Sequence, residues 1–389
     1  MDCPCGSGLR AAILRRKTVE GSRRGNQIVA MRGRRRINLA LQGGGAHGAF
    51  TWGVLDELLR DEDLSLGWIS GTSAGAVNAV ALASGLAGSG REEAQATLRA
   101  VWEAVETAGV PDLLRFNPLL FGFARAAPIA GVANFLSPYD FNPLGFDPLR
   151  RILTENIDFE RIRTSSPVEL LIAATDVATG RARLFRRHEL TVDAVLASAC
   201  LPNLHRAVII DGRAYWDGGF SANPDLLTLA AESPVEDTLL VQLNPLYHAA
   251  VPRSAGEIAD RVNTITFNQP LLRDVQAIVT AQEEDLGWFS SRNNRTGRLK
   301  RHRFHLIEAG PYTAGLSADT KLRPDKGLLT YLHGAGRAEA KKWLQAHRAA
   351  IGRHSTVDLR ARFLEANGRA YAVDEGEVRS AVSGSEGRG

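Results

Sequence analysis

Three short glycine-rich stretches hold the residues of this chain whose types and spacing could carry out chemistry. Residues 43–48 read GGGAHG, residues 71–75 read GTSAG, and residues 217–219 read DGG. Together they offer a serine hydroxyl, a carboxylate and a run of unhindered backbone amides. Those groups could serve as a nucleophile, a proton acceptor and donors to a developing oxyanion, which are the parts needed to cleave an ester.

Ser73 stands in a G-x-S-x-G pattern between Gly71 and Gly75. An apolar stretch (66–70) precedes it and an Ala/Val-rich stretch (74–84) follows it, which predicts a strand, a sharp turn and a buried helix. A nucleophile elbow needs this context, because glycines two places either side remove Cβ atoms that would clash in the turn. The alternative is a serine that only caps the helix.

Residues 43–48 could form either of two kinds of binding loop. Gly43, Gly45 and Gly48 fit the G-x-G-x-x-G fingerprint of a dinucleotide site, which predicts an acid at the end of the second strand, about 20 residues on. Asp61 and Asp63 are at that distance, but they precede the second predicted strand. The loop could instead present amides to an oxyanion, as a helix N-terminus does for any anion.

Asp217 is the candidate base. It ends a predicted hairpin (208–216, turning at Asp211–Gly212) and is followed by Gly218 and Gly219, which allow other groups to approach closely. A carboxylate is a weak base at its reference pKa of about 3.9, so Asp217 would need desolvation. Two alternatives are a turn-forming aspartate and a serine–acid–histidine triad using one of the downstream histidines.

The elements around these stretches alternate between strands and helices. We expect strands at 37–41, 66–70, 168–175, 183–185, 238–243 and 304–308. We expect helices at 49–60, 74–84, 91–107, 149–155, 192–199, 255–289 and 335–349. This alternation predicts an α/β sandwich with a mostly parallel central sheet.

Charge and composition divide the chain into segments. Residues 1–35 are basic and without periodicity, so we expect a disordered tail. The net charge of +4 in the whole chain comes from this tail, which argues against a nucleic-acid partner. We expect a catalytic core at 36–230, a part completing the fold at 231–350, and a helical to disordered tail at 351–389. Within the core, 111–149 is rich in phenylalanine and proline. We expect it to be an apolar insertion that caps the site, and the alternative is a second small packed core.

Other features exclude several classes of protein. The three cysteines show no disulfide pattern, and Cys200 lies in an apolar stretch, so it is expected to be a buried thiol. No apolar run is long enough to span a bilayer. No acid or histidine cluster has convincing metal spacing; His302-x-x-His305 is expected to be structural. The basic stretch 292–305 could touch anionic lipid head groups. We therefore expect no metal or cofactor, and a cytoplasmic protein with peripheral membrane contact.

The three motifs, in this order, resemble those of the bacterial patatin-like phospholipases, as does the stretch ASACLPN at 197–203. The resemblance implies a three-layer α/β/α sandwich and a Ser73–Asp217 dyad rather than a triad. It also implies an oxyanion hole at Gly43, Gly44 and Gly45, and a phospholipid or other acyl-ester lipid as substrate. Where the family often has Arg or Lys, this chain has His47, whose charge would depend on pH.

The leading prediction is a serine lipid acyl hydrolase, such as a phospholipase A or a lysophospholipase. Among enzymes, a short-chain carboxylesterase and a polyester depolymerase remain alternatives. The non-enzymatic alternative is a nucleotide-binding α/β module, which would have no need for a serine on an elbow.

Overall fold

The fold is organised around one mixed sheet. The structure, a computed structural model, describes residues 35–108, 137–141, 147–248, 251–284, 294–313, 315–316 and 318–365. Strand order across the sheet is β5-β6-β3-β2-β1-β7-β8, and β4 also pairs with β3. The strands are β1 (Arg35–Leu41), β2 (Leu64–Gly71), β3 (Leu170–Asp176), β4 (Ala182–Arg186), β5 (Val208–Ile210), β6 (Arg213–Asp217), β7 (Asp237–Gln242) and β8 (Arg303–Glu308).

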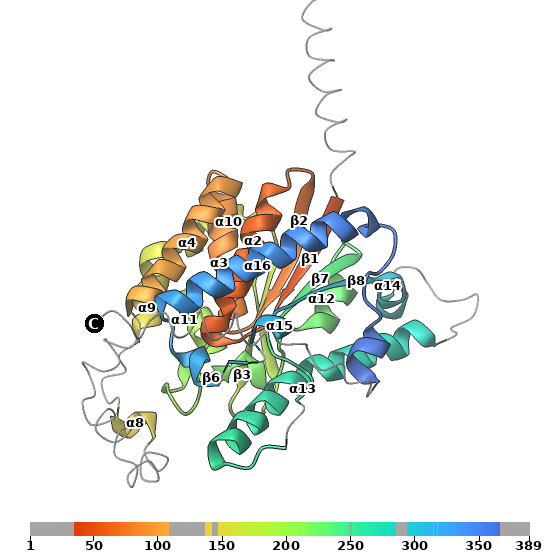
Figure 1. Ribbon diagram of the computed structural model, residues 1–389. Helices are drawn as coiled ribbons and strands as arrows, with labels where there is room; N and C mark the ends of the chain where they lie inside the picture. Colours follow the sequence, from red (N-terminus) through yellow and green to blue (C-terminus); the bar gives the residue numbers. More distant parts are fainter. Residues whose placement is uncertain are drawn as a thin grey trace, which may run out of the picture.

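Most neighbouring strands are parallel. Strands β8, β7, β1, β2 and β3 pair in parallel, whereas β4 and β6 run antiparallel to β3. Parallel strands need crossover connections, and helices supply them on both faces of this sheet (Figure 1).

Helices cover the sheet on two sides. One face is covered by α2 (Gly48–Arg60), α3 (Ala74–Ala87), α4 (Arg91–Ala108), α9 (Pro148–Asn156), α10 (Phe159–Ser165), α11 (Val192–Ser198) and α16 (Lys326–His347). The other is covered by α12 (Leu226–Glu232), α13 (Ala255–Glu283), α14 (Arg295–Arg301) and the π-helical turn η6 (Arg360–Leu364). Two short helices, α8 (Pro138–Phe141) and α15 (Gly310–Thr313), complete the described set.

Side-chain alternation along the strands creates two separate cores. In β1, Leu39 and Leu41 point into the core under α2 and α3, while Ala40 between them points into the core under α12 and α13. In β7, Leu239 points into the core under α2 and α3, and Leu240 points into the core under α12 and α13. A sheet buried on both faces gives continuous apolar strands. The predicted three-layer sandwich with a mostly parallel sheet is confirmed.

The predicted hairpin is also confirmed. Strands β5 and β6 pair antiparallel around Asp211 and Gly212, whose φ angles are 49° and 76°. Positive φ at both central residues defines the type I′ turn that Asp-Gly favours.

Helices α10, α12 and α14 do not follow from the sequence pattern. Each has seven residues, and in α10 and α14 polar side chains fill most positions, so no apolar stripe marks these two helices. Their N-terminal residues give the better signal, because Asp158, Asp225 and Asn294 each cap the helix with a side-chain oxygen.

Several predicted segments lie wholly or partly outside the described residues. These are the basic tail at 1–35, of which only Arg35 is described, and most of the expected cap at 111–149. Of the cap, the structure describes 137–141 and 147–149. Within the expected tail 351–389, residues 351–365 are described and pack against α13 through Leu359 and Phe363.

Helices α2 and α16 cross at close range. A Cβ added to Gly336 would lie 2.0 Å from the carbonyl oxygen of Phe50, and one added to Gly53 would lie 2.0 Å from the carbonyl oxygen of His333. No real side chain tolerates such distances, so the two glycines set the separation of the helices.

We predict that Gly336→Ala lowers the free energy of unfolding by about 1–3 kcal/mol, because α16 must shift away from α2. Gly334→Ala is the matched control: this exposed glycine of the same helix has no atom within 4 Å of an added Cβ. There, better helix propensity should stabilise the protein by up to about 1 kcal/mol. Urea denaturation of both variants checks this, and equal effects would contradict the close-crossing interpretation.

Candidate active site

Sheet register brings the three motifs to one edge of the sheet. Leu41 of β1 is level with Gly71 of β2, and Gly71 is level with Ile172 of β3. Two residues further along come Gly43, Ser73 and Ala174. Asp217 pairs with Ala174 from the antiparallel strand β6. The loop, the serine and the acid therefore lie at the same level of the sheet, on adjacent strands, although 174 positions separate Gly43 from Asp217.

Ser73 occupies a strained backbone position between β2 and α3. Its φ of 54° is unusual for a residue other than glycine. The predicted sharp turn is thus present, and Gly75 permits it: a Cβ there would lie 2.1 Å from the carbonyl oxygen of Leu41. The side chain of Ser73 does not cap α3, so the helix-cap alternative is wrong. Strain of this kind at a polar residue is typical of functional sites.

The stretch ASACLPN links the serine to the acid. The Ser198 hydroxyl oxygen accepts a hydrogen bond of 3.0 Å from the amide of Ser73. The carbonyl oxygen of Cys200 accepts one of 2.8 Å from the amide of Asp217. Cys200 is buried, as predicted. This segment therefore fixes both backbones, and Ser198 is a positioning residue that the sequence analysis did not identify.

Asp217 is a fully buried carboxyl group. Its Oδ1 accepts a 2.7 Å hydrogen bond from the amide of Gly219, whereas Oδ2 is buried with no partner of normal hydrogen-bond geometry among the described residues. Burial raises the pKa of Asp217 to about 7, although the Gly219 amide and the neighbouring Ser73 hydroxyl both act to lower it. This is the desolvation that a carboxylate needs to become a useful base.

The amides of the glycine loop are not equivalent. Gly43 donates its N–H to Asn223 Oδ1 at 2.8 Å, so this amide is already used within the protein. The N–H groups of Gly44 and Gly45 donate to no acceptor in the described part of the chain, and both glycines reach the surface.

Asn223 is the second positioning residue that the sequence analysis missed. It is fully buried, and its amide group also donates to the carbonyl oxygen of Phe267 at 3.0 Å. The signal was available: an asparagine follows the Asp-Gly-Gly motif closely and directly precedes a proline, in a stretch with no other large polar side chain.

A buried polar network holds the loop from behind. Gln42 Oε1 accepts hydrogen bonds of 2.8 Å from the amides of Leu243 and Asn244. The Asn244 side chain donates to the carbonyl oxygen of Gly43 at 3.1 Å and accepts from Lys321 Nζ at 2.6 Å. Every buried member has a partner, which makes the loop rigid.

His47 does not carry the switchable charge expected for it. Burial, and the nearby positive charge of Lys321, lower the pKa of His47 to about 3, so the ring is neutral at physiological pH. Its Nε2 hydrogen-bonds Thr320 Oγ1 at 2.8 Å. The expectation of a pH-dependent charge here is wrong, because the loop buries the ring on folding.

The histidines of this chain make no bond to the serine or the acid. In the described part of the chain, which includes every histidine, none hydrogen-bonds Ser73 or Asp217. His302 and His305 bond Thr238 and Asp237, at the opposite end of β7 from the glycine loop. Among the described residues there is no group of three or more potential metal ligands.

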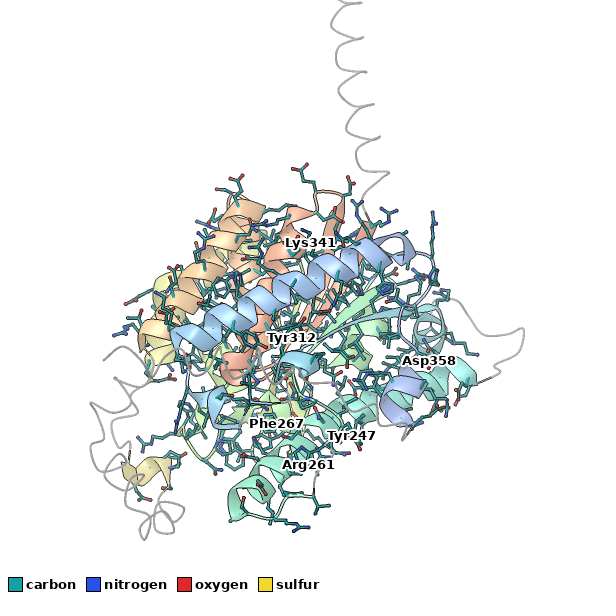
Figure 2. All side chains as sticks on the ribbon, viewed as in Figure 1. Tyr247, Arg261, Phe267, Tyr312, Lys341 and Asp358 are labelled. Atoms are coloured by element: carbon teal, nitrogen blue, oxygen red, sulfur yellow. The ribbon has the colours of Figure 1, made fainter. Side chains whose placement is uncertain are left out.

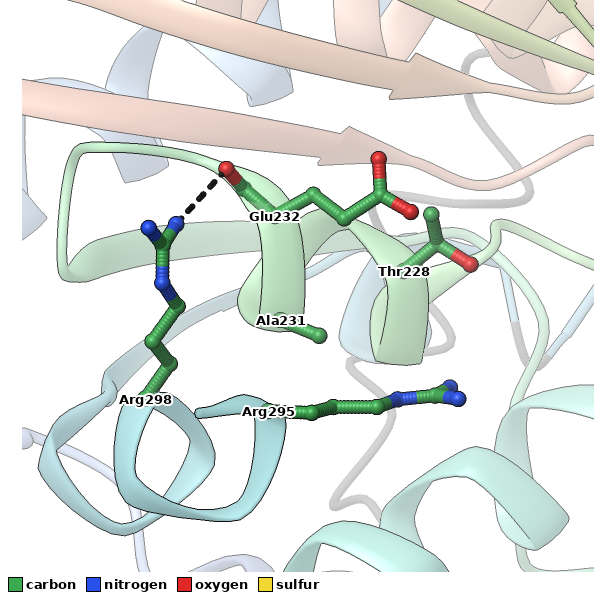
Figure 3. Close-up of a pocket in the computed structure, with 5 residues that line it drawn as sticks. All are labelled: Thr228, Ala231, Glu232, Arg295 and Arg298. Atoms are coloured by element: carbon green, nitrogen blue, oxygen red, sulfur yellow. Dashed lines mark hydrogen bonds between the residues drawn. The ribbon is translucent and has the colours of Figure 1, made fainter. Parts of the chain in front are cut away.

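Part of the basic stretch 292–305 is engaged in contacts within the protein. Figure 3 shows Arg295 and Arg298 of α14 beside α12, with Arg298 donating to the carbonyl oxygen of Glu232. Arg301 and Arg303 both form ion pairs with Glu236. The surface pocket here, of about 510 Å³, lies on the α12 face, away from Ser73.

Comparison with protein-family models matches residues 39–230 to the family described as patatin-like phospholipase. These residues form a patatin-like phospholipase domain. The matched range contains all three glycine-rich motifs and the ASACLPN stretch. Membership supports lipid acyl hydrolysis as the general activity.

Comparison with solved structures also finds proteins similar to this chain. VipD from Legionella pneumophila has 15% identity and a TM-score of 0.39, over 80% of this chain and 67% of its own. ExoU from Pseudomonas aeruginosa, solved with SpcU, has 16% identity and a TM-score of 0.24, over 90% and 68%. None of the curated proteins matches this chain.

The burial of Asp217 makes a prediction about stability. Asp217 has a folded pKa of about 7 against a reference value of 3.8, so its ionisation opposes folding as pH rises from about 4 and does so fully above about 7. Asp217→Asn, which stays neutral and can still accept from Gly219, should therefore stabilise the patatin-like domain. The gain should increase from pH 5 to pH 8.5, to at most about 4 kcal/mol.

Denaturation in urea at the two pH values measures this gain. Asp211→Asn, on the exposed hairpin turn, is the matched control and should show no pH-dependent difference. A gain for Asp217→Asn that is the same at both pH values would contradict a raised pKa.

Proposed function

We propose that this protein is a serine hydrolase that cleaves acyl esters of lipids, as a phospholipase A or lysophospholipase, through a Ser73–Asp217 dyad. One observation carries the proposal: sheet register places Ser73 level with Asp217, a fully buried carboxyl group whose Oδ2 has no ordinary hydrogen-bond partner among the described residues. Supporting it are the strained turn at Ser73 and the surface-accessible amides beside it.

In the proposed first half-reaction, Ser73 Oγ attacks the ester carbonyl carbon while Asp217 takes up the hydroxyl proton. The resulting oxyanion accepts hydrogen bonds from the amides of Gly44 and Gly45. In this proposal the Gly43 amide does not donate to the substrate, because it already donates to Asn223 Oδ1 and holds the loop in place. Collapse of the tetrahedral intermediate breaks the bond to the alcohol, which leaves with the proton from Asp217.

In the second half-reaction, water attacks the acyl-enzyme. Asp217 accepts a proton from this water and returns it to Ser73 Oγ as the fatty acid leaves. A pKa near 7 suits both directions of transfer, because the carboxyl group can accept and release a proton near ambient pH.

The buried thiol of Cys200 is free, which suits a reducing compartment. Among the helices that the structure describes, none is both long and apolar enough to cross a bilayer. We propose a cytoplasmic protein that meets its substrate by peripheral contact with a lipid surface.

We predict that Ser73→Ala and Asp217→Asn each lower kcat for hydrolysis of a phospholipid or lysophospholipid by at least about 10³-fold. The double variant should be little worse than either single one, because the two residues act as a unit. Ser65→Ala, at the far end of β2, and Asp211→Asn should retain full activity.

The same assay, run over a lipid panel, separates the alternatives. Activity confined to a short-chain ester such as p-nitrophenyl acetate, or to a polyester, would replace the lipid hydrolase with one of those enzymes. Near-normal turnover in Asp217→Asn would overturn the dyad.

A further inference from the structure

A cavity of about 270 Å³ lies next to the glycine loop, and nothing in the proposed chemistry uses it. It is lined by His47, by residues from 245–248, by the first half of α13, and by Lys321. Its volume corresponds to about nine water molecules. Figure 2 labels two of its lining residues, Tyr247 and Arg261.

The cavity and the serine flank the same short loop. Gly43 packs against Ser73, since a Cβ on Gly43 would lie 2.9 Å from that of Ser73. At the other end of the loop, a Cβ on Gly45 would lie 2.3 Å from the carbonyl oxygen of Lys321. A substrate whose ester group is at Ser73 could therefore extend across the loop into the cavity.

The deeper part of the cavity is cationic. Lys321 is half-buried, and its hydrogen bond to the neutral Asn244 uses one of three ammonium donors. Arg261 is also half-buried, and no ion pair joins it to any residue that the structure describes. The carboxylate of Asp260 acts on the Lys321 charge from a distance, but among the described residues no ion pair is formed, so Lys321 keeps ammonium donors for an anionic ligand. Charge-assisted hydrogen bonds to such a ligand are among the strongest available.

His47 adds an unused polar atom. Its ring is 2% exposed and lines the cavity, and its Nδ1 is buried without a partner in the described part of the chain. Orphaned polar atoms of this kind are rare in folded proteins unless a ligand, ion or water completes them.

Two exposed acids, Glu257 and Asp260, also line the cavity. Glu257, Asp260, Arg261 and Thr264 line it from one face of α13, as their spacing of three, four and seven residues requires. Glu257 is already engaged, since it accepts from the amides of Arg253 and Ser254. Asp260 is exposed, and no hydrogen bond or ion pair ties down its carboxylate within the described residues.

We propose that this cavity binds the zwitterionic phosphodiester head group of the lipid substrate, with the phosphate at Lys321 and Arg261 and the amine at Asp260. The proposal rests on the proposed lipid hydrolase function and extends it to head-group specificity. The order of charges matches the ligand: from the ester outward, a phospholipid of this class presents a phosphate and then an ammonium group. Lys321 thereby supplies a positive charge beside His47, where the ring itself has none.

Binding of soluble head-group compounds to the Ser73→Ala protein tests the site without turnover. We expect sn-glycero-3-phosphoethanolamine to bind, and glycerol to bind at least tenfold more weakly. Arg261→Gln should weaken binding of both glycerophosphoethanolamine and glycerol 3-phosphate by at least tenfold. Asp260→Asn should weaken only the first, because glycerol 3-phosphate has no amine.

Arg253→Gln is the matched control, since Arg253 is an exposed arginine just before α13 that does not line the cavity; it should leave both affinities unchanged. Equal effects of Arg253→Gln and Arg261→Gln, or equal binding of glycerol and glycerophosphoethanolamine, would overturn the proposal. Equal binding of glycerol 3-phosphate and glycerophosphoethanolamine, with neither weakened by Asp260→Asn, would show a simple phosphate site and refute the zwitterion.

Hydrolysis by the enzyme with Ser73 intact distinguishes failure of this inference from failure of the proposed function. Arg261→Gln should raise KM for lysophosphatidylethanolamine by about tenfold and leave kinetics on a monoacylglycerol unchanged. An equal change on both substrates would refute the head-group site while leaving the hydrolase intact. No hydrolysis of either lipid by the wild-type protein would refute the function itself.

Discussion

The burial of the Asp217 carboxyl group is the constraint on which the rest of this site depends. One of its oxygens accepts a hydrogen bond from the Gly219 amide, and the other has no ordinary donor among the described residues. Removing a carboxylate from water raises its pKa, here to about 7. At that value the group exchanges protons readily near neutral pH, whereas an exposed aspartate would be too weak a base. Burial of the ionised carboxylate lowers the free energy of unfolding, and the same desolvation gives Asp217 its proposed strength as a base.

The sheet supplies the geometry that this carboxyl group requires. Parallel β1 and β2 bring the glycine loop and Ser73 to the same edge, and the antiparallel strand β6 delivers Asp217 to that level from the other direction. The Ser198 hydroxyl and the Cys200 carbonyl accept hydrogen bonds from the amides of Ser73 and Asp217, and so hold the serine and the acid relative to each other. Asn223 and Asn244 fix the loop by its Gly43 amide and carbonyl, which leaves the next two amides available. Preorganised donors of this kind need no rearrangement when charge develops.

Much of the fold could be predicted from the sequence, since its long elements carry clear periodicity and its turns carry Gly and Asp-Gly. The residues proposed to be catalytic could be located in the sequence because their backbone requirements restrict the residues around them: Ser73 needs Gly75, and Asp217 needs small neighbours. Helix α14 was missed because Leu299 is its one large apolar residue, which cannot form an apolar stripe.

The supporting residues were harder to predict because their partners are distant in sequence. Asn223 acts on Gly43 from 180 positions away, and Lys321 approaches His47 from 274 positions away. Neither contact leaves a local pattern, since each depends on which loops the folded sheet brings together. The charge of His47 was misjudged for the same reason: its pKa depends on burial and on a lysine that no local motif predicts.

Covalent labelling with a fluorophosphonate as a function of pH tests the central claim most directly. The account predicts a single adduct, mapped by mass spectrometry to Ser73, with a labelling rate that rises with pH around a midpoint near 7, where Asp217 loses its proton. The Asp217→Asn protein should label far more slowly at every pH. An adduct on another residue, or a labelling rate that survives Asp217→Asn but is lost when a histidine is replaced by alanine, would contradict it.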